Sequence, residues 1–133
     1  MANITWSFST PINDINTIDY VENNFTVKLP PELRDLILKH NGGYPSLSRC
    51  EIPEYGETDF KMLLSYNDDD DETIFDVLDY FVKKYHKRVI PFESDSGSGY
   101  FCVKDDYIVF CADELSSPVP ISENISAFLS ILY

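Results

Sequence analysis

Among the side chains that can take part in chemistry, carboxylates are the ones whose number and spacing are unusual in this sequence. Residues 51–79 contain eleven aspartates and glutamates against a single base, Lys61, and so carry −10 of the formal net charge of −13. Carboxylates in such numbers can bind a hard cation such as Ca²⁺, act as a catalytic acid and base, or attract a basic partner. Their spacing decides between these kinds of chemistry.

The acidic run at residues 68–72 does not have the pattern of a calcium-binding loop. An EF-hand loop needs glycine at its sixth position, and the sixth position counted from Asp68 is Thr73. His40 and His86 are isolated and have no partner at metal-ligand spacing. We therefore expect neither a metal site nor a cofactor.

No motif identifies a catalytic group. Ser96 and Ser98 do not lie in a nucleophile elbow. Acids are so abundant that any fold brings some of them together, which makes a pair of carboxylates uninformative. The segment 97–99 lacks the lysine of a phosphate loop, and Glu93 and Asp95 beside it would repel phosphate. We therefore expect a protein without enzymatic activity.

The concentrated negative charge favours a basic protein partner. It repels nucleic-acid backbones and anionic lipids, and it raises the association rate with basic proteins. Tyr55 lies in a loop of this segment, and tyrosine is a common interface anchor, whereas Tyr44 and Tyr66 are expected to pack within the fold. We expect no direct nucleic-acid partner and no membrane. The predicted partner-binding residues are Glu51, Glu54, Tyr55, Glu57, Asp59, Asp68, Asp69, Asp70, Asp71 and Glu72.

The same acids also have an interpretation that involves no partner. Carboxylates that precede a helix stabilise its N-terminus, and charges on an edge strand prevent aggregation. Runs of like charge are usually solvated faces. At the level of the sequence both interpretations stay open, and they can be true together.

Length and composition indicate one cytoplasmic domain over residues 1–133. Apolar residues make up 44% of the chain and aromatic residues 14%, which is enough for a hydrophobic core. The start of the sequence, residues 1–5, lacks the basic and apolar regions of a secretory signal, and no window approaches the roughly 18 apolar residues of a membrane helix. Three cysteines at irregular spacing form neither a disulfide framework nor a zinc motif.

The spacing of apolar residues predicts helices separated by clear end signals. Glycine and asparagine stop helices because they adopt the left-handed cap conformation readily, and proline fits the first helical turn. The expected boundaries are Thr10 before a helix over residues 11–25, Leu29-Pro30-Pro31 and Asn41-Gly42-Gly43 around the second, Thr73 before the third, and Ser122 before the last.

Strands are predicted between these helices. Residues 46–59 are expected to form an acidic loop or an irregular strand pair, and residues 60–66 and 89–92 to form strands. Residues 100–104 and 107–111 then form a hairpin, with Phe101, Val103, Ile108 and Phe110 on its core face and a partly exposed opposite face. The expected fold class is α+β: a mainly antiparallel sheet with helices packed on one side.

The order of these landmarks resembles the SUKH superfamily, a domain shared by bacterial immunity proteins and a eukaryotic cell-wall regulator. The resemblance spans nearly the whole chain. The residues that carry it are Leu29-Pro30, Asn41-Gly42-Gly43-Tyr44-Pro45, Ile90-Pro91-Phe92, the turn Asp95-Ser96-Gly97-Ser98-Gly99, the hairpin from Phe101 to Phe110, and Asp113-Glu114. The turn departs from the aspartate-glycine-glycine form that is frequent in the family, so no ligand role is transferred to it.

The resemblance implies a non-enzymatic immunity protein that binds and occludes a cognate toxin domain. Many such toxins are nucleases with basic active surfaces, and the acidic segment suits a target of that kind. The alternative is a regulatory scaffold of the cell-wall-regulator type with no toxin partner. We expect a monomer or a weak homodimer, the latter formed through the mixed face of the hairpin.

Overall fold

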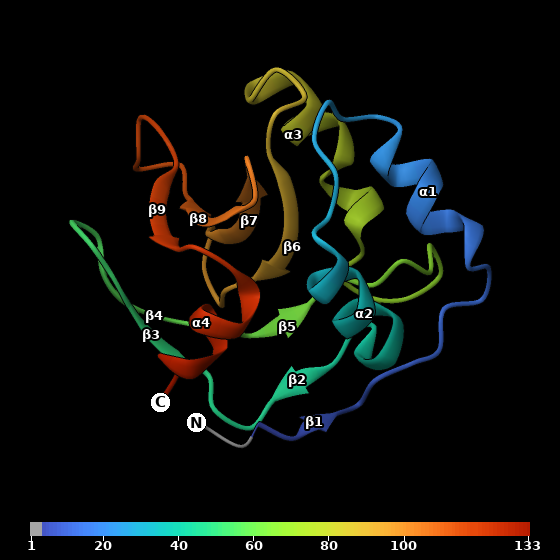
Figure 1. Ribbon diagram of the computed structural model, residues 1–133, viewed down its shortest axis with the longest axis horizontal. Helices are drawn as coiled ribbons and strands as arrows, with labels where there is room; N and C mark the ends of the chain where they lie inside the picture. The colour runs from blue at the N-terminus through green and yellow to red at the C-terminus, as the bar shows by residue number, and fades with distance from the viewer. Residues whose placement is uncertain (1–3) are drawn as a thin grey trace.

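A five-stranded antiparallel sheet organises the fold of this chain (Figure 1). The structure is a computed structural model that describes residues 4–133; the first three residues of the expected domain 1–133 lie outside the described residues. The large sheet has the order β5-β6-β7-β8-β9, and two smaller pairs, β1–β2 and β3–β4, flank it. The expected α+β class is confirmed.

The elements are short and follow one another closely. The strands are β1 (Trp6–Ser7), β2 (Tyr44–Pro45), β3 (Arg49–Ile52), β4 (Gly56–Asp59), β5 (Met62–Leu63), β6 (Ile90–Ser94), β7 (Tyr100–Lys104), β8 (Tyr107–Cys111) and β9 (Val119–Ser122). The helices are α1 (Asn16–Glu22), α2 (Pro31–His40), the 3₁₀ turn η1 (Ile74–Asp76), α3 (Leu78–Lys84) and α4 (Ile125–Ser130).

The β7–β8 hairpin has the register that its alternating sequence predicts. Phe101 lies opposite Phe110, and the two turn residues Asp105 and Asp106 have φ angles of 50° and 68°, as a type I′ turn requires. On this face the ring of Phe101 lies 5.2 Å from that of Phe128 in α4 and 5.1 Å from that of Phe110. The expected core face is therefore confirmed.

The opposite face of the hairpin is partly covered by α3. Phe81 of α3 packs edge-on against Tyr100, with ring centroids 5.3 Å apart. Cys102, Val109 and Cys111 are at most 2% exposed. Tyr107 on the same face is 48% exposed, so the expectation of a mixed, partly exposed face is confirmed. Because α3 packs on this face and α4 on the core face, helices lie on both sides of the hairpin and not on one side as expected.

The second helix has the predicted boundaries and the first does not. α2 begins at Pro31 and is followed by Gly42, whose φ of +71° suits a residue without a Cβ. The expected helix over residues 11–25 is reduced to α1, because the Asp14 carboxylate accepts a hydrogen bond from the backbone N–H of Asn16 and starts the helix there. Thr10 is not a cap.

Further boundaries differ from the prediction for local reasons. The expected strand over residues 60–66 is reduced to β5, while the expected irregular pair over 46–59 is the regular hairpin β3–β4. Thr73 caps the third helix as predicted, but that helix is divided into η1 and α3. The last helix is capped by Asn124, whose Oδ1 accepts from the N–H of Ala127, and not by Ser122.

One buried asparagine joins three separate segments. Asn41, 1% exposed, accepts a hydrogen bond from the backbone N–H of Tyr66 at 2.8 Å through its Oδ1. Its Nδ2 donates to the Ser65 hydroxyl at 3.0 Å and to the Thr10 carbonyl at 3.2 Å. The end of α2, the segment after β5 and the N-terminal segment are thereby fixed to one another.

We predict that Asn41→Ala destabilises the protein by about 2–3 kcal/mol, because it leaves the Tyr66 N–H and the Thr10 carbonyl without their partner. Urea unfolding followed by circular dichroism measures this change. Asn23→Ala, an exposed position at the end of α1, is the control and should change stability by less than about 0.5 kcal/mol. Equal stability of the two variants would contradict the role of Asn41.

Candidate partner-binding surface

The fold separates the acidic segment into two surfaces. We call β3–β4 with Glu51, Glu54, Glu57 and Asp59 the acidic hairpin, and residues 68–72 the acidic loop. In Figure 1 the tip of the acidic hairpin projects at the left, while the acidic loop lies at the right, between α1 and α2. The tip of the acidic hairpin and the acidic loop therefore lie apart from each other.

Two acids of the acidic hairpin are engaged by the fold. Glu57 accepts hydrogen bonds from the Tyr133 hydroxyl and from Arg49, and these bonds lower its pKa. Burial opposes ionisation of Asp59, but the hydrogen bonds that it accepts from Ser96 outweigh this effect and lower its pKa. These two carboxylates hold the hairpin in place as anions.

Contacts with the 95–99 turn and the sheet fix the direction of the acidic hairpin. The Thr58 hydroxyl donates to Asp95 Oδ2 at 2.9 Å, and Asp95 Oδ1 accepts from the N–H groups of Gly97 and Gly99. A Cβ on Gly99 would lie 2.3 Å from the Phe110 ring, so only glycine fits there. The serine-rich turn thus has a structural role.

Tyr55 is half-buried and contributes to this anchoring. Its ring lies 4.8 Å from that of Phe110, and desolvation raises the pKa of its hydroxyl. The side chain predicted as an interface anchor therefore has part of its surface committed to the sheet. Tyr66 packs within the fold as expected, at 1% exposure.

The acidic loop also contains engaged acids. Asp70 Oδ2 accepts from the Ser65 hydroxyl at 2.6 Å and from the Thr10 hydroxyl at 2.9 Å, and these bonds lower its pKa. Glu72 pairs with Lys61 at 3.0 Å.

The remaining predicted acids are exposed on the surface. Among residues 4–133, no side-chain hydrogen bond or ion pair involves the following five carboxylates: Glu51 and Glu54 on the acidic hairpin, and Asp68, Asp69 and Asp71 on the acidic loop. These are the charges that a partner can reach without breaking a contact of the fold.

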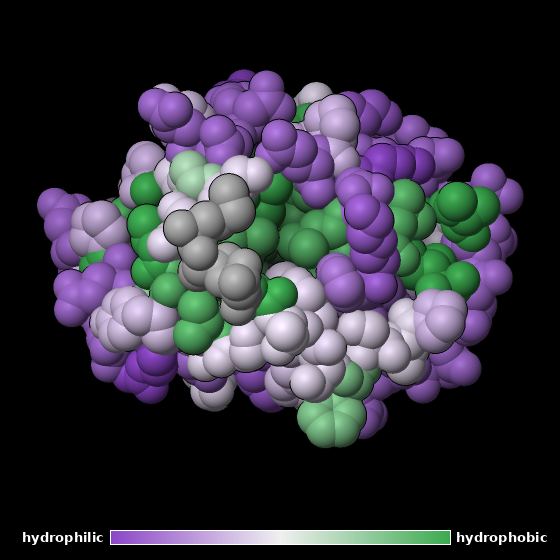
Figure 2. All heavy atoms as spheres, turned by 60° about the horizontal axis from the view of Figure 1, so that its bottom comes forward, coloured by the Kyte–Doolittle hydropathy of each residue, from purple (hydrophilic) through white to green (hydrophobic). Residues whose placement is uncertain are grey.

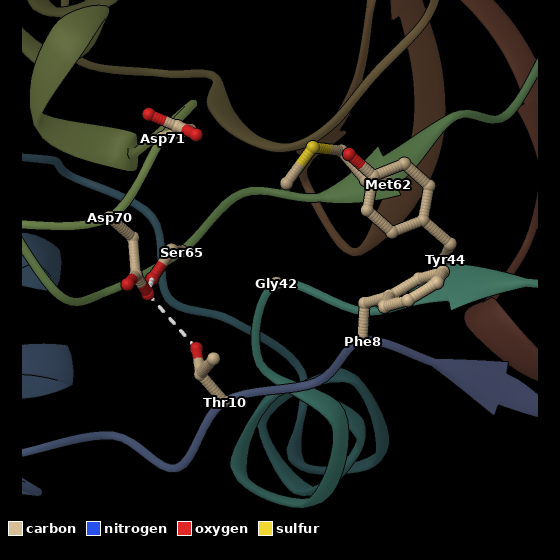
Figure 3. A pocket seen from close by; sticks show the side chains of 8 residues that line it. All are labelled: Phe8, Thr10, Gly42, Tyr44, Met62, Ser65, Asp70 and Asp71. Atoms are coloured by element: carbon tan, nitrogen blue, oxygen red, sulfur yellow. Dashed lines mark hydrogen bonds between the residues drawn. The ribbon is translucent and has the colours of Figure 1, made fainter.

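A pocket that the sequence did not reveal lies beside the acidic loop. Figure 3 shows Asp70 and Asp71 on one side and Phe8, Tyr44 and Met62 on the other; its volume is about 160 Å³. Tyr44 is 37% exposed and contacts Phe8, so our expectation that it packs within the fold holds only in part.

Figure 2 shows the face that carries β1 and β2, where hydrophobic residues gather across the middle and hydrophilic ones at the margins.

Glu93 is a buried acid that was not among the predicted partner-binding residues. It is fully buried in β6; its Oε1 accepts from the Met62 N–H at 2.8 Å, and its Oε2 has no hydrogen-bond partner among the described residues. Burial raises its pKa well above the usual range, and the charges of Asp59, Asp95 and Glu72 add to the effect. The sequence signal that could have identified it is a glutamate placed directly after the apolar run of residues 89–92.

Within residues 4–133, no three His, Cys, Asp or Glu side chains are arranged to hold a metal ion. The same described part of the chain contains no helix with the length and apolar character that crossing a bilayer requires. All three cysteines are buried free thiols, and desolvation raises the pKa of Cys50 to about 11.

Comparison with known families confirms the resemblance drawn from the sequence. The family model described as SMI1 / KNR4 family (SUKH-1) matches residues 13–131 of the chain. The match includes all the residues that were predicted to bind a partner. No curated protein shows a significant match to this chain.

We predict that Glu93→Gln stabilises the protein increasingly as the pH rises. A folded-state pKa above the unfolded value means that the stability contributed by neutral Glu93 is fully present below the unfolded pKa and is lost as pH rises through the folded pKa. Glutamine keeps the acceptor for Met62 and does not ionise. Urea unfolding of both proteins between about pH 4 and pH 9 measures the difference.

The control for this prediction is Glu54→Gln, which removes an exposed carboxylate from the acidic hairpin. Its stability difference from the unmodified protein should stay nearly constant across the pH range. A constant difference for Glu93→Gln as well would show that Glu93 titrates normally.

Proposed function

We propose that this chain, which belongs to the SMI1/KNR4 family (SUKH-1), is a non-enzymatic immunity protein that binds a basic toxin domain in the cytoplasm and blocks its active site. The observation that carries the proposal is the set of five exposed carboxylates that have no side-chain partner among residues 4–133, on two surfaces whose other acids are held by hydrogen bonds and ion pairs. Direct binding of nucleic acid or membrane has no place in this function, because the same charges repel phosphate.

The arrangement of the acidic loop supports a partner-directed role. Asp70 and Glu72 stabilise the loop. Asp68, Asp69 and Asp71 repel one another, and their side chains make no hydrogen bond or ion pair within the described part of the chain. A basic partner relieves that repulsion, and the field of the loop accelerates the encounter. Against a nuclease, these carboxylates occupy positions where substrate phosphates would lie.

A regulatory scaffold is the second candidate function. The family description that matches the chain names SMI1/KNR4 and specifies no toxin. A scaffold would use the same surfaces to bind host proteins and would have no activity to neutralise. The two functions therefore differ in the partner and not in the chemistry of the surface.

Affinity capture from the native host, followed by stepped salt elution and an activity assay, tests the proposal. We expect a basic domain that elutes at moderate salt, is toxic when expressed alone, and loses its activity when mixed with the protein in equal amounts. Retention of host enzymes that are neither toxic nor inhibited would establish the scaffold function. A partner that binds to an uncharged surface of the protein would contradict the role of the acidic residues in both candidate functions.

We predict that Asp69→Lys with Asp71→Lys slows association with that partner about tenfold or more at low salt. Both side chains are exposed and have no partner among the residues that the structure describes, so the fold should survive. Asp70 is left unchanged because the Ser65 and Thr10 hydroxyls donate to it. Stopped-flow association kinetics at several salt concentrations provide the measurement.

Two double variants with the same change in charge serve as comparisons. Glu51→Lys with Glu54→Lys tests the acidic hairpin, and Asp79→Lys with Glu123→Lys changes exposed acids outside both surfaces. An equal effect of all three pairs would mean that net charge alone governs association, and would remove the loop from the binding surface.

A further inference from the structure

We propose that the pocket between the acidic loop and the Phe8–Tyr44 pair receives one arginine side chain of the partner. This inference rests on the proposed function for the partner itself and adds the chemistry of its central contact. The pocket is lined by residues from the N-terminal segment, the end of α2, β2, β5 and the acidic loop (Figure 3).

The aromatic side of the pocket is the primary observation. Phe8 is 82% exposed and has a φ of +62°, a backbone conformation that is rare for a bulky residue. The Phe8 ring packs edge-on against the Tyr44 ring, with centroids 5.9 Å apart and an interplanar angle of 88°. Most of the Phe8 side chain is exposed to solvent. Both the exposed apolar area and the backbone conformation cost free energy, and neither is required by the core.

The acidic side of the pocket supplies charge complementarity. Asp70 is held rigidly because its Oδ2 accepts the hydroxyl hydrogen bonds of Ser65 and Thr10, while its Oδ1 accepts none among the described residues. Asp71 is exposed beside it. One hydrogen-bonded and one exposed carboxylate thus line the pocket opposite an aromatic pair, and a cation with a flat face can contact both sides.

The size of the pocket indicates a single side chain. Sites for drug-sized ligands have volumes of roughly 300–1,000 Å³, whereas this pocket has about 160 Å³. Arginine fits the lining better than lysine, because its planar guanidinium stacks on aromatic rings and donates two parallel hydrogen bonds to a carboxylate. The Met62 thioether can pack against the methylene groups of the same side chain.

A blocked amino acid tests the pocket without any partner. Amide chemical shifts of the isotopically labelled protein are followed while N-acetyl-arginine amide is added, with N-acetyl-lysine amide and the uncharged N-acetyl-citrulline amide as comparisons. We expect shifts concentrated at Phe8, Tyr44, Asp70 and Asp71 for arginine, smaller shifts for lysine, and none for citrulline. Equal shifts for lysine, or shifts spread evenly over all exposed acids, would overturn the inference.

Matched variants then identify the contacts. Phe8→Ala should weaken arginine binding by about twofold to tenfold, while Tyr107→Ala, which removes another exposed aromatic ring, should leave it unchanged. Asp71→Asn should weaken it as well, and Asp79→Asn should not. Both pocket residues are exposed, so unchanged circular dichroism spectra are expected for every variant.

The captured partner separates failure of this inference from failure of the proposed function. If the unmodified protein neutralises a basic toxin and Phe8→Ala neutralises it equally well, the pocket is not the contact and the proposed function stands. If no basic toxin is bound but the arginine titration succeeds as described, the pocket is a cation site on a protein with another role.

Discussion

The buried amide of Asn41 is the interaction on which the position of the acidic loop depends. Its Nδ2 donates to the Ser65 hydroxyl, and that hydroxyl donates in turn to Asp70. Thr10, whose carbonyl accepts from Asn41, also donates its hydroxyl to Asp70. Hydrogen bonds that follow one another in this way strengthen each other in a low-dielectric interior. The acidic loop is therefore connected to the buried Asn41 through hydrogen bonds, although most of its carboxylates are exposed to solvent.

The acids of the acidic hairpin and the acidic loop have different roles in the structure. The sequence offered partner binding and simple solvation as two interpretations of all its charges, whereas the structure distributes roles among individual residues. Glu57, Asp59, Asp70 and Glu72 stabilise local structure through hydrogen bonds and ion pairs. Within residues 4–133, the other predicted acids make no side-chain hydrogen bond or ion pair. Rigid backbone and free charge together are what electrostatic recognition requires, since an ordered surface loses little entropy on binding.

Features that depend on local sequence could be predicted, and features that depend on distant contacts could not. The β7–β8 hairpin follows from alternation and from an Asp105-Asp106 turn, and α2 follows from its proline start and glycine stop. The start of α1 depended on Asp14 competing for the backbone, which periodicity does not register. The burial of Glu93 and the exposure of Phe8 depend on how separate segments meet, and the residue type predicts the opposite in both cases.

Surface charge and the core are also linked through Glu93. Burial raises the pKa of its carboxyl, and the charges of Asp59, Asp95 and Glu72 raise it further. A cation brought close to Asp59 or Glu72 offsets part of that negative field and makes ionisation of Glu93 less unfavourable. Because Glu93 Oε1 also accepts the N–H of Met62, any such change acts on the β5–β6 pairing that borders the pocket. The raised pKa of Glu93 therefore reflects both the sheet that buries its carboxyl and the carboxylates of Asp59, Asp95 and Glu72 around it.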